Sequence, residues 1–197
     1  MCYDFARMID QLVIPDFLDA AEREQLISEM LSAEGGPSTV YGKEASGVVD
    51  SLVRKVTRLN VSQATSERIA RKLLDRKGEV ESRFALRVST CEEPQFLRYR
   101  AGDFFVAHQD GNTPVLLDDS RFRKVSVVIF LNRQSEEPAP GTYGGGSLVF
   151  HGAYPDFGLR FPADNTPGNF LAFRAETTHE VVPVTRGERY TIISWYR

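Results

Sequence analysis

The feature that most constrains the fold of this chain is a series of short β-type segments that begins near residue 86. Each segment is rich in β-branched and aromatic residues, and Gly, Pro or Asp separates it from the next. The segments read QFLRYR, DFFVAHQ, KVSVVIFLN, GGGSLVFHG, NFLAFRA, HEVVPV and RYTIISWYR. Several short strands at close spacing, with no helical pattern between them, indicate an antiparallel sandwich or barrel.

The N-terminal part of the chain has a helical pattern instead. Residues 14–36 place apolar side chains at helical spacing, offer Asp16 or Asp19 as the N-cap, and end in two glycines. Residues 62–84 form a second amphipathic helical pattern, and residues 53–61 alternate as a strand between the two. We therefore expect helices to cover one side of the β core.

No internal repeat divides the chain, so we expect a single domain over residues 1–197. Its helix-rich layer would span 1–85 and its β core 86–197, which gives an α+β fold that is mainly β. Two segments rich in Gly, Ser and Pro, 36–51 and 133–146, are long loops. Such loops either close over a site as lids or lie on the surface without a role, and both readings stay open.

Charge and composition exclude several classes of protein. A net charge of −3 gives no electrostatic case for a nucleic acid or an anionic membrane as partner, and the short basic run 54–58 is typical of a solvated strand face. The two cysteines, Cys2 and Cys91, have no ligand-like spacing, which fits a reducing compartment. No apolar run approaches the ~20 residues of a transmembrane helix. We expect a cytoplasmic protein.

A histidine and an aspartate follow one of the apolar segments, in FFVAHQDGN. If the strand stays extended through His108 and Asp110, its two-residue period points both side chains to one face. An imidazole beside a carboxylate is two-thirds of an iron site. Alternatively, the pair is only the polar end of a strand, so the interpretation depends on a third ligand.

The last strand carries an arginine among apolar residues. Arg189, Thr191, Ile193 and Trp195 share one face of RYTIISWYR. A guanidinium on an inward face is costly unless it meets an anion, and arginine grips a carboxylate through two parallel hydrogen bonds. This strand therefore predicts a carboxylate-binding position.

The two remaining histidines, His151 and His179, compete for the place of third ligand. Two histidines and a carboxylate that leave open coordination positions are typical of non-haem Fe(II) oxygenases. His151 ends an apolar strand, which is an ordinary structural place for a histidine. His179 lies ten positions before Arg189.

In this ordered set the sequence resembles the Fe(II)/2-oxoglutarate-dependent dioxygenases, and within them the prolyl 4-hydroxylase-like group. The resemblance covers roughly residues 94–197. It rests on RYRAGDFFVAHQD with Tyr99, on VSVVIFLN, on GGGSLVF, on the distal His179 and on GERYTIISWYR. Where relatives often carry an acidic residue after the glycines, this chain has Ser147, which weakens inferences about a shared substrate.

The resemblance implies a double-stranded β-helix, a jelly-roll core buttressed by the N-terminal helices. It implies Fe(II) held by His108, Asp110 and His179, with 2-oxoglutarate and O2 as cosubstrates and ascorbate as reductant. In that family the arginine ten positions after the distal histidine binds the far carboxylate of 2-oxoglutarate, which favours His179 over His151 and gives Arg189 its role.

Three further residues receive expected roles at the same site. Tyr99 and Thr191 would help Arg189 to bind the cosubstrate, and Trp195 would line the substrate pocket. The alternatives are a buried tyrosine bonded to backbone, a threonine placed by β propensity, and a tryptophan of the core.

The resemblance implies hydroxylation of an unactivated C–H bond, with 2-oxoglutarate and O2 converted to succinate and CO2. Halogenating members replace the ligand carboxylate by a small residue, so Asp110 argues for hydroxylation. The substrate is expected to be a prolyl residue of a peptide or protein, or alternatively a free amino acid or other small metabolite. A non-catalytic jelly-roll binding module is a third reading, and the oligomeric state is left open.

Overall fold

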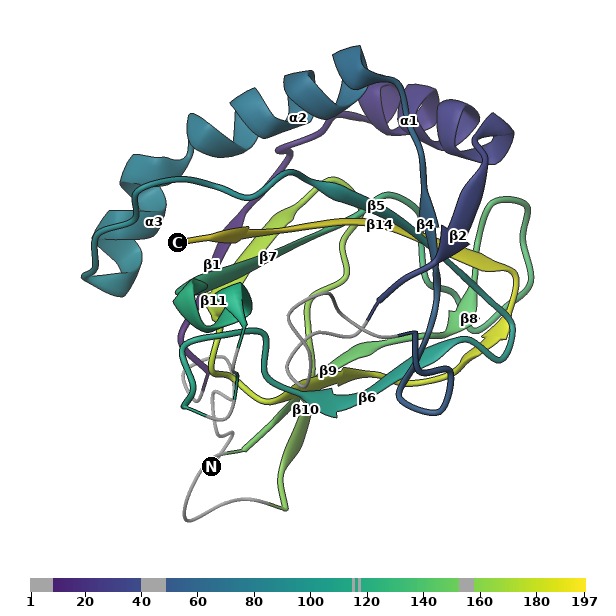
Figure 1. Ribbon diagram of the computed structural model, residues 1–197. Coiled ribbons are helices and arrows are strands. Elements are labelled where there is room, and N and C mark those ends of the chain that lie inside the picture. Colours follow the sequence, from purple (N-terminus) through teal and green to yellow (C-terminus); the bar gives the residue numbers. More distant parts are fainter. Residues whose placement is uncertain (1–8, 40–48, 115, 117, 153–157) are drawn as a thin grey trace, which may run out of the picture.

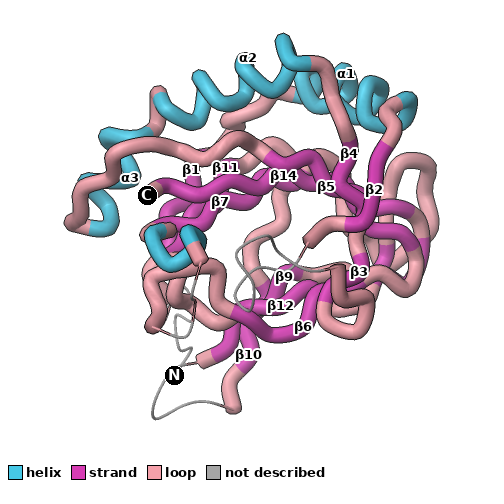
Figure 2. The backbone as a smooth tube through the Cα atoms, viewed as in Figure 1, coloured by secondary structure: helices cyan, strands magenta, loops and turns pink. Residues whose placement is uncertain are grey.

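The computed structural model describes residues 9–39, 49–114, 116, 118–152 and 158–197. Its strands form two antiparallel sheets that face each other, and its helices lie on the outer face of the larger sheet (Figures 1 and 2). This arrangement confirms the mainly β fold and the jelly-roll core expected from the sequence. The helices cover one sheet only, so the space between the two sheets is left for side chains and for a site.

The larger sheet has seven strands in the described residues, and its order places the C-terminal strand at the centre. The order is β1 (Gln11–Ile14), β11 (Phe170–Arg174), β7 (Val125–Phe130), β14 (Glu188–Tyr196), β5 (Gln95–Arg100), β4 (Thr57–Leu59) and β2 (Gly35–Pro37). Strand β7 is buried along its whole length because helices cover one face and the second sheet covers the other. Strand β1 was not anticipated from the sequence.

The smaller sheet has five strands in the described residues, and two further short strands pair with each other separately. The order of the smaller sheet is β10 (Arg160–Pro162), β9 (Leu148–His151), β12 (His179–Val181), β6 (Phe104–His108) and β3 (Arg54–Lys55). The pair consists of β8 (Gly144–Gly145) and β13 (Val184–Arg186).

The expected strand at 53–61 contributes to both sheets. Its first part, β3, pairs with β6 in the smaller sheet, and its second part, β4, pairs with β5 in the larger one. Arg54 and Val56 are buried on the inward side of this crossing. The strand was predicted, but the transfer between sheets was not.

Three α-helices are present in the described residues. Helix α1 (Ala20–Ser32) begins at the N-cap Asp19, whose carboxylate accepts from the Glu22 backbone while the Glu22 side chain accepts in return. The expected helix over 62–84 is divided into α2 (Gln63–Leu74) and α3 (Lys77–Phe84). At the division the Leu73 carbonyl accepts from both the Arg76 N–H and the Tyr196 hydroxyl, which ends α2.

Two apolar cores stabilise the fold. One lies between the helices and the larger sheet, and includes Leu26, Ile69 and Phe84. The other fills the space between the sheets, and includes Leu97 and Phe173. Because the second core stops short of filling that space, a pocket remains between the sheets.

The two loop segments considered as lids, 36–51 and 133–146, differ in how much of them the structure describes. Most of segment 36–51 lies outside the described residues. Segment 133–146 packs against its surroundings: Gln134 bridges to Tyr143, and Gly144 and Gly145 pair with β13. None of its residues lines the pocket between the sheets. None of the described helices combines the length and the apolar character needed to cross a membrane.

Candidate metal and anion site

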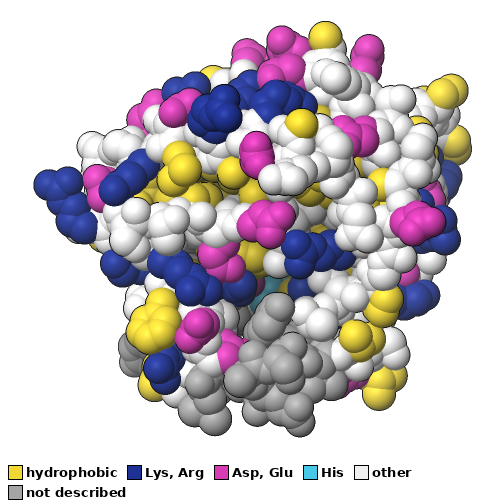
Figure 3. Space-filling model, turned by 45° about the horizontal axis from the view of Figure 1, so that its top comes forward, with side chains coloured by type: hydrophobic (Ala, Val, Ile, Leu, Met, Phe, Trp, Pro, Cys, Tyr) yellow, Lys and Arg dark blue, Asp and Glu magenta, His cyan; other side chains and the backbone are white. Residues whose placement is uncertain are grey.

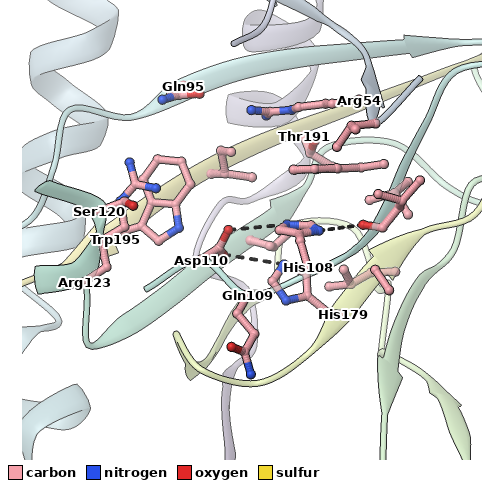
Figure 4. Close-up of a pocket in the computed structure, with 18 of the residues that line it drawn as sticks. Arg54, Gln95, His108, Gln109, Asp110, Ser120, Arg123, His179, Thr191 and Trp195 are labelled. Atoms are coloured by element: carbon pink, nitrogen blue, oxygen red, sulfur yellow. Dashed lines mark hydrogen bonds and ion pairs between the residues drawn. The ribbon is translucent and has the colours of Figure 1, made fainter. Parts of the chain in front are cut away.

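A pocket opens between the two sheets, and every residue singled out from the sequence for the site lines it. These residues are Tyr99, His108, Asp110, His179, Arg189, Thr191 and Trp195. They come from both sheets and from the loop after β6, as Figure 4 shows for most of them. On the surface a histidine side chain is visible at the bottom of a hollow, with Lys and Arg side chains on both sides (Figure 3).

Strand pairing brings the two histidines together. His179 begins β12 and lies directly opposite His108, the last residue of β6. Strand β6 ends at His108. The extended strand through Asp110 that was considered from the sequence is not present. Asp110 is held instead by its backbone N–H, which donates to the Ala175 carbonyl at 2.9 Å, and by the Ser126 hydroxyl, which donates to Oδ2 at 2.7 Å.

The hydrogen bonds of the two histidines determine which ring nitrogen faces the aspartate. Nδ1 of His108 lies 2.8 Å from the Val106 carbonyl, and Nδ1 of His179 lies 2.9 Å from the Thr177 carbonyl. Because a carbonyl only accepts, each Nδ1 carries a proton, and Nε2 is the nitrogen left to face the aspartate. These Nε2 atoms lie 3.4 and 3.5 Å from the carboxylate oxygens of Asp110.

Burial and the contacts between these side chains determine the protonation states of His179 and Asp110. Burial, together with the nearby His108, lowers the pKa of His179 to about 4, so this imidazole is neutral at physiological pH. Burial alone would raise the pKa of Asp110, but the neighbouring His179 and His108 outweigh it and hold this pKa well below its usual range. The group therefore contains a neutral imidazole at His179 and an ionised carboxylate at Asp110.

These three residues fit a divalent metal ion. Their ligand atoms all lie within 4.8 Å of one another. Two imidazole nitrogens and a carboxylate lie close together here, an arrangement that a bound cation would stabilise. The backbone carbonyls that orient each Nδ1 are the outer partners that ligating histidines usually have.

His151 is not part of this group. Its Nε2 lies 2.9 Å from a carboxylate oxygen of Glu180, which also pairs with Arg160. Among the described residues, the cluster able to hold a metal consists of His108, Asp110 and His179.

A buried arginine lies in the same pocket. Arg189 is 1% exposed, and its Nε and Nη1 have no hydrogen-bond partner. The hydroxyls of Thr191 and Tyr143 are likewise buried and unpaired. The guanidinium lies against two rings, 4.8 Å from the centroid of Tyr99 and 5.1 Å from that of Phe130.

A buried hydrogen-bond donor without an acceptor costs free energy. The unpaired groups of Arg189, Thr191 and Tyr143 therefore indicate that an acceptor binds between them. A carboxylate would accept from Arg189 and from the hydroxyls beside it. A ligand with a carboxylate at one end and metal-binding oxygens at the other therefore fits this pocket. Tyr143 was not anticipated, because it lies in a Gly-rich loop with no strand pattern.

Trp195 lines the pocket as expected from the face it shares with Arg189. The Arg123 guanidinium lies over its ring at 3.6 Å from the centroid, and Arg123 in turn donates to both carboxylate oxygens of Glu92 at 2.8 Å. The tryptophan is thus held rigidly in the wall.

The pocket also has polar lining residues that sequence reasoning missed. They are Thr39, Arg54, Gln95, Gln109, Ser120 and Arg123. Strand parity would have indicated two of them: Arg54 shares a face with the inward Val56, and Gln95 shares a face with Tyr99.

Known proteins show similarity to this chain in sequence. A model of the 2OG-Fe(II) oxygenase superfamily matches residues 94–197, more than half of the chain. A PKHD-type hydroxylase from Burkholderia ambifaria is 31% identical over 188 residues, which are 92% of this chain and 76% of that protein. A PKHD-type hydroxylase from Paracoccus denitrificans is 30% identical over 188 residues, with coverage of 93% and 76%.

Solved structures share the fold. A prolyl-4-hydroxylase from Pseudomonas putida aligns with a TM-score of 0.70 at 21% identity, and covers 98% of this chain and 95% of its own. A prolyl hydroxylase from Trichoplax adhaerens, in complex with a hypoxia inducible factor peptide fragment, aligns with a TM-score of 0.69 at 19% identity, covering 98% and 86%. The family model and the relatives at 30–31% identity show that the chain belongs to the 2OG-Fe(II) oxygenase superfamily, whose members are enzymes.

Proposed function

We propose that this protein is an Fe(II)- and 2-oxoglutarate-dependent hydroxylase that acts on a prolyl residue of a peptide or protein. The observation that carries the proposal is the convergence, in one pocket, of a complete two-histidine, one-carboxylate group and an unpaired buried arginine. Either feature alone has structural explanations. Both together match a metal ion and a dicarboxylate cosubstrate.

In this proposal His108, Asp110 and His179 hold Fe(II). The neutral state of His179 and the ionised state of Asp110 make both residues competent ligands at physiological pH without loss of a proton. Ser126 and the carbonyls of Val106 and Thr177 keep the ligands oriented.

Arg189 binds the carboxylate of 2-oxoglutarate that lies farthest from the metal. Thr191 supplies a hydroxyl beside it, and Tyr99 forms the adjoining wall. When bound, Fe(II) and 2-oxoglutarate supply the oxidation of the C–H bond, with O2 and 2-oxoglutarate converted to succinate and CO2. Apolar side chains such as Val128, Leu148 and Ile193 surround this region and exclude water from it.

Trp195 provides a flat wall for the substrate. Arg123 and Glu92 fix its ring, and an immobilised aromatic face suits a small saturated ring such as that of proline. The names of the relatives support a hydroxylase, and two fold neighbours are prolyl hydroxylases. A free amino acid or another small metabolite is the alternative substrate.

Further parts of the proposal concern the surroundings of the enzyme. Ascorbate is the proposed reductant, and the cytoplasm is the proposed location. The net charge of −3 argues against a nucleic acid as substrate.

The test is succinate formation from 2-oxoglutarate under air, with and without Fe(II). Iron-dependent succinate is expected from the wild type and not from Asp110→Ala, since this change removes the anionic ligand. Glu180→Ala is the matched control. Glu180 is a carboxylate that contacts His151, and neither residue lines the pocket, so the loss of Glu180 should leave turnover intact. Turnover that is independent of iron, or equal in wild type and Asp110→Ala, would refute the proposal.

A further inference from the structure

A second buried arginine enters the pocket from the smaller sheet. Arg54 lies on β3, the edge strand, and is 7% exposed. It lines the same pocket as His108 and Asp110, and its guanidinium points into that pocket on the side of Gln95 (Figure 4). The sequence placed this residue in a basic run that was read as a solvated strand face, and the structure corrects that reading because the strand crosses between the sheets.

Within the described part of the chain, the contacts of Arg54 include no carboxylate. Nη1 donates to the Thr39 carbonyl at 2.9 Å, and the guanidinium lies 4.7 Å from the ring centroid of Phe105. Nε is buried and has no hydrogen-bond partner. Among the residues that the structure describes, no carboxylate lies within ion-pair distance of Arg54. Burial accordingly lowers the pKa of Arg54, with Tyr99 and Asp110 acting in the opposite sense.

Arg123, another buried arginine of the pocket, differs from Arg54 because it has a carboxylate partner. Arg123 also lines the pocket and is also buried, but Glu92 neutralises it through two hydrogen bonds of 2.8 Å. A buried guanidinium without such a partner is expensive in free energy. An anion in the pocket beside Arg54 would offset that cost and would accept from the free Nε.

The position of Arg54 differs from that of Arg189. Arg189 lies on the central strand of the larger sheet, between β5 and β7, at the inner part of the pocket. Arg54 lies on an edge strand of the opposite sheet, and its neighbours in the lining include Thr39, Val53 and the partly exposed Val106. In the proposed function 2-oxoglutarate pairs with Arg189, so Arg54, on the opposite sheet, is left to a second molecule in the same pocket.

We propose that Arg54 binds a carboxylate of the hydroxylated substrate, so that the enzyme selects an anionic substrate. This inference rests on the proposed function, because it assumes that 2-oxoglutarate occupies the position at Arg189. The carboxylate belongs either to a free amino acid or other small acid, or to an Asp or Glu side chain next to the hydroxylated residue of a peptide. The recognition chemistry is the same in both cases, a charge-assisted hydrogen bond in a water-poor pocket.

The experiment uses protein loaded with Mn(II) and saturating 2-oxoglutarate, which fills the metal and cosubstrate positions without turnover. Two matched probe pairs are titrated: N-acetyl-L-proline against N-acetyl-L-prolinamide, and the amidated peptide acetyl-Ala-Pro-Asp against acetyl-Ala-Pro-Asn. Binding near the metal is read from the relaxation that Mn(II) induces in the probe protons. This readout does not depend on catalysis.

The wild type should bind the charged member of one pair roughly 10- to 100-fold more tightly than its neutral counterpart. The pair that shows the preference identifies the source of the carboxylate. Arg54→Gln should remove the preference, and Arg54→Lys should keep part of it because the charge remains. Lys55→Gln, the next residue on β3, is the matched control and should behave as the wild type.

Equal binding of charged and neutral probes in both pairs, or no binding of any probe, would overturn the assignment of Arg54. A preference for the charged probe that persists in Arg54→Gln would also overturn it. A selective loss of 2-oxoglutarate affinity in that variant would overturn it too, because Arg54 would then contact the cosubstrate. Unchanged affinity for Mn(II) and 2-oxoglutarate shows that the variant is folded. If the wild type binds no 2-oxoglutarate in the presence of Mn(II), the proposed function itself has failed.

Discussion

Replacement of Arg189 by methionine should make the protein more stable and at the same time unable to hold 2-oxoglutarate. The arginine is buried among the rings of Tyr99 and Phe130, and its Nε and Nη1 lack partners. Methionine has a similar length and no charge, so it fills the same space without requiring an anion. The opposite signs of the two effects distinguish a ligand-binding arginine from a structural one.

The size of each effect follows from the contacts. Hydrogen bonds to a charged group contribute about 1.5–3 kcal/mol each, so loss of two donors should weaken 2-oxoglutarate binding by roughly 10²- to 10⁴-fold. In the ligand-free protein, relief of an unpaired buried charge is partly offset by loss of two cation–π contacts, each of about 0.5–2 kcal/mol. A net gain of about 1 kcal/mol corresponds to a rise in Tm of roughly 2–4 °C for a domain of this size.

The assay is thermal unfolding of metal-free and Mn(II)-loaded protein, with and without 2-oxoglutarate. The wild type should gain stability from 2-oxoglutarate only when Mn(II) is present, and Arg189→Met should start from a higher Tm and gain nothing. Arg100→Met, on the exposed end of β5, provides a control for the substitution itself. A lower Tm together with unchanged stabilisation by 2-oxoglutarate would refute this account of Arg189.

Three further predictions follow from the site and its surroundings. His179→Ala should abolish Mn(II) binding in isothermal titration while His151→Ala leaves it intact, and the reverse result would reassign the third ligand. Because the pKa of His179 is about 4 in the fold and 6.5 in the unfolded chain, the unfolded state binds more protons between these values. The free energy of unfolding of the metal-free protein should therefore rise between about pH 4 and 6.5, by up to ~1.4 kcal/mol per pH unit. The rise should be less steep in His179→Gln. Urea unfolding that shows no pH dependence would contradict this expectation. Burial raises the pKa of the Cys91 thiol to about 11, so iodoacetamide at pH 8 should leave Cys91 of the native protein unmodified in peptide mapping, and rapid alkylation would contradict its burial.

The parts of the site that were predictable lie on regular strands. The two-residue period of β14 places Arg189, Thr191 and Trp195 on one face, and all three line the pocket. The convergence of His108 with His179 depends on pairing between β6 and β12, which are far apart in the chain. Single-sequence periodicity does not specify such pairing, and the resemblance to a known family supplied it.

The parts that were missed depend on tertiary context. Arg54 was read as solvated because a short basic run is usually exposed, whereas here the strand crosses from one sheet to the other and turns the side chain inward. Tyr143 lies in a loop without periodicity, and only packing brings its hydroxyl to the buried region around Arg189. The Leu73 carbonyl, near the end of α2, accepts from the Tyr196 hydroxyl, which comes from the other end of the chain.

The most direct test of the central claim is anomalous diffraction at the manganese edge from crystals grown with Mn(II) and 2-oxoglutarate. We expect a single strong peak bonded to Nε2 of His108, a carboxylate oxygen of Asp110 and Nε2 of His179, with 2-oxoglutarate extending from the metal to Arg189. A peak at another place, or a cosubstrate carboxylate bound away from Arg189, would contradict it.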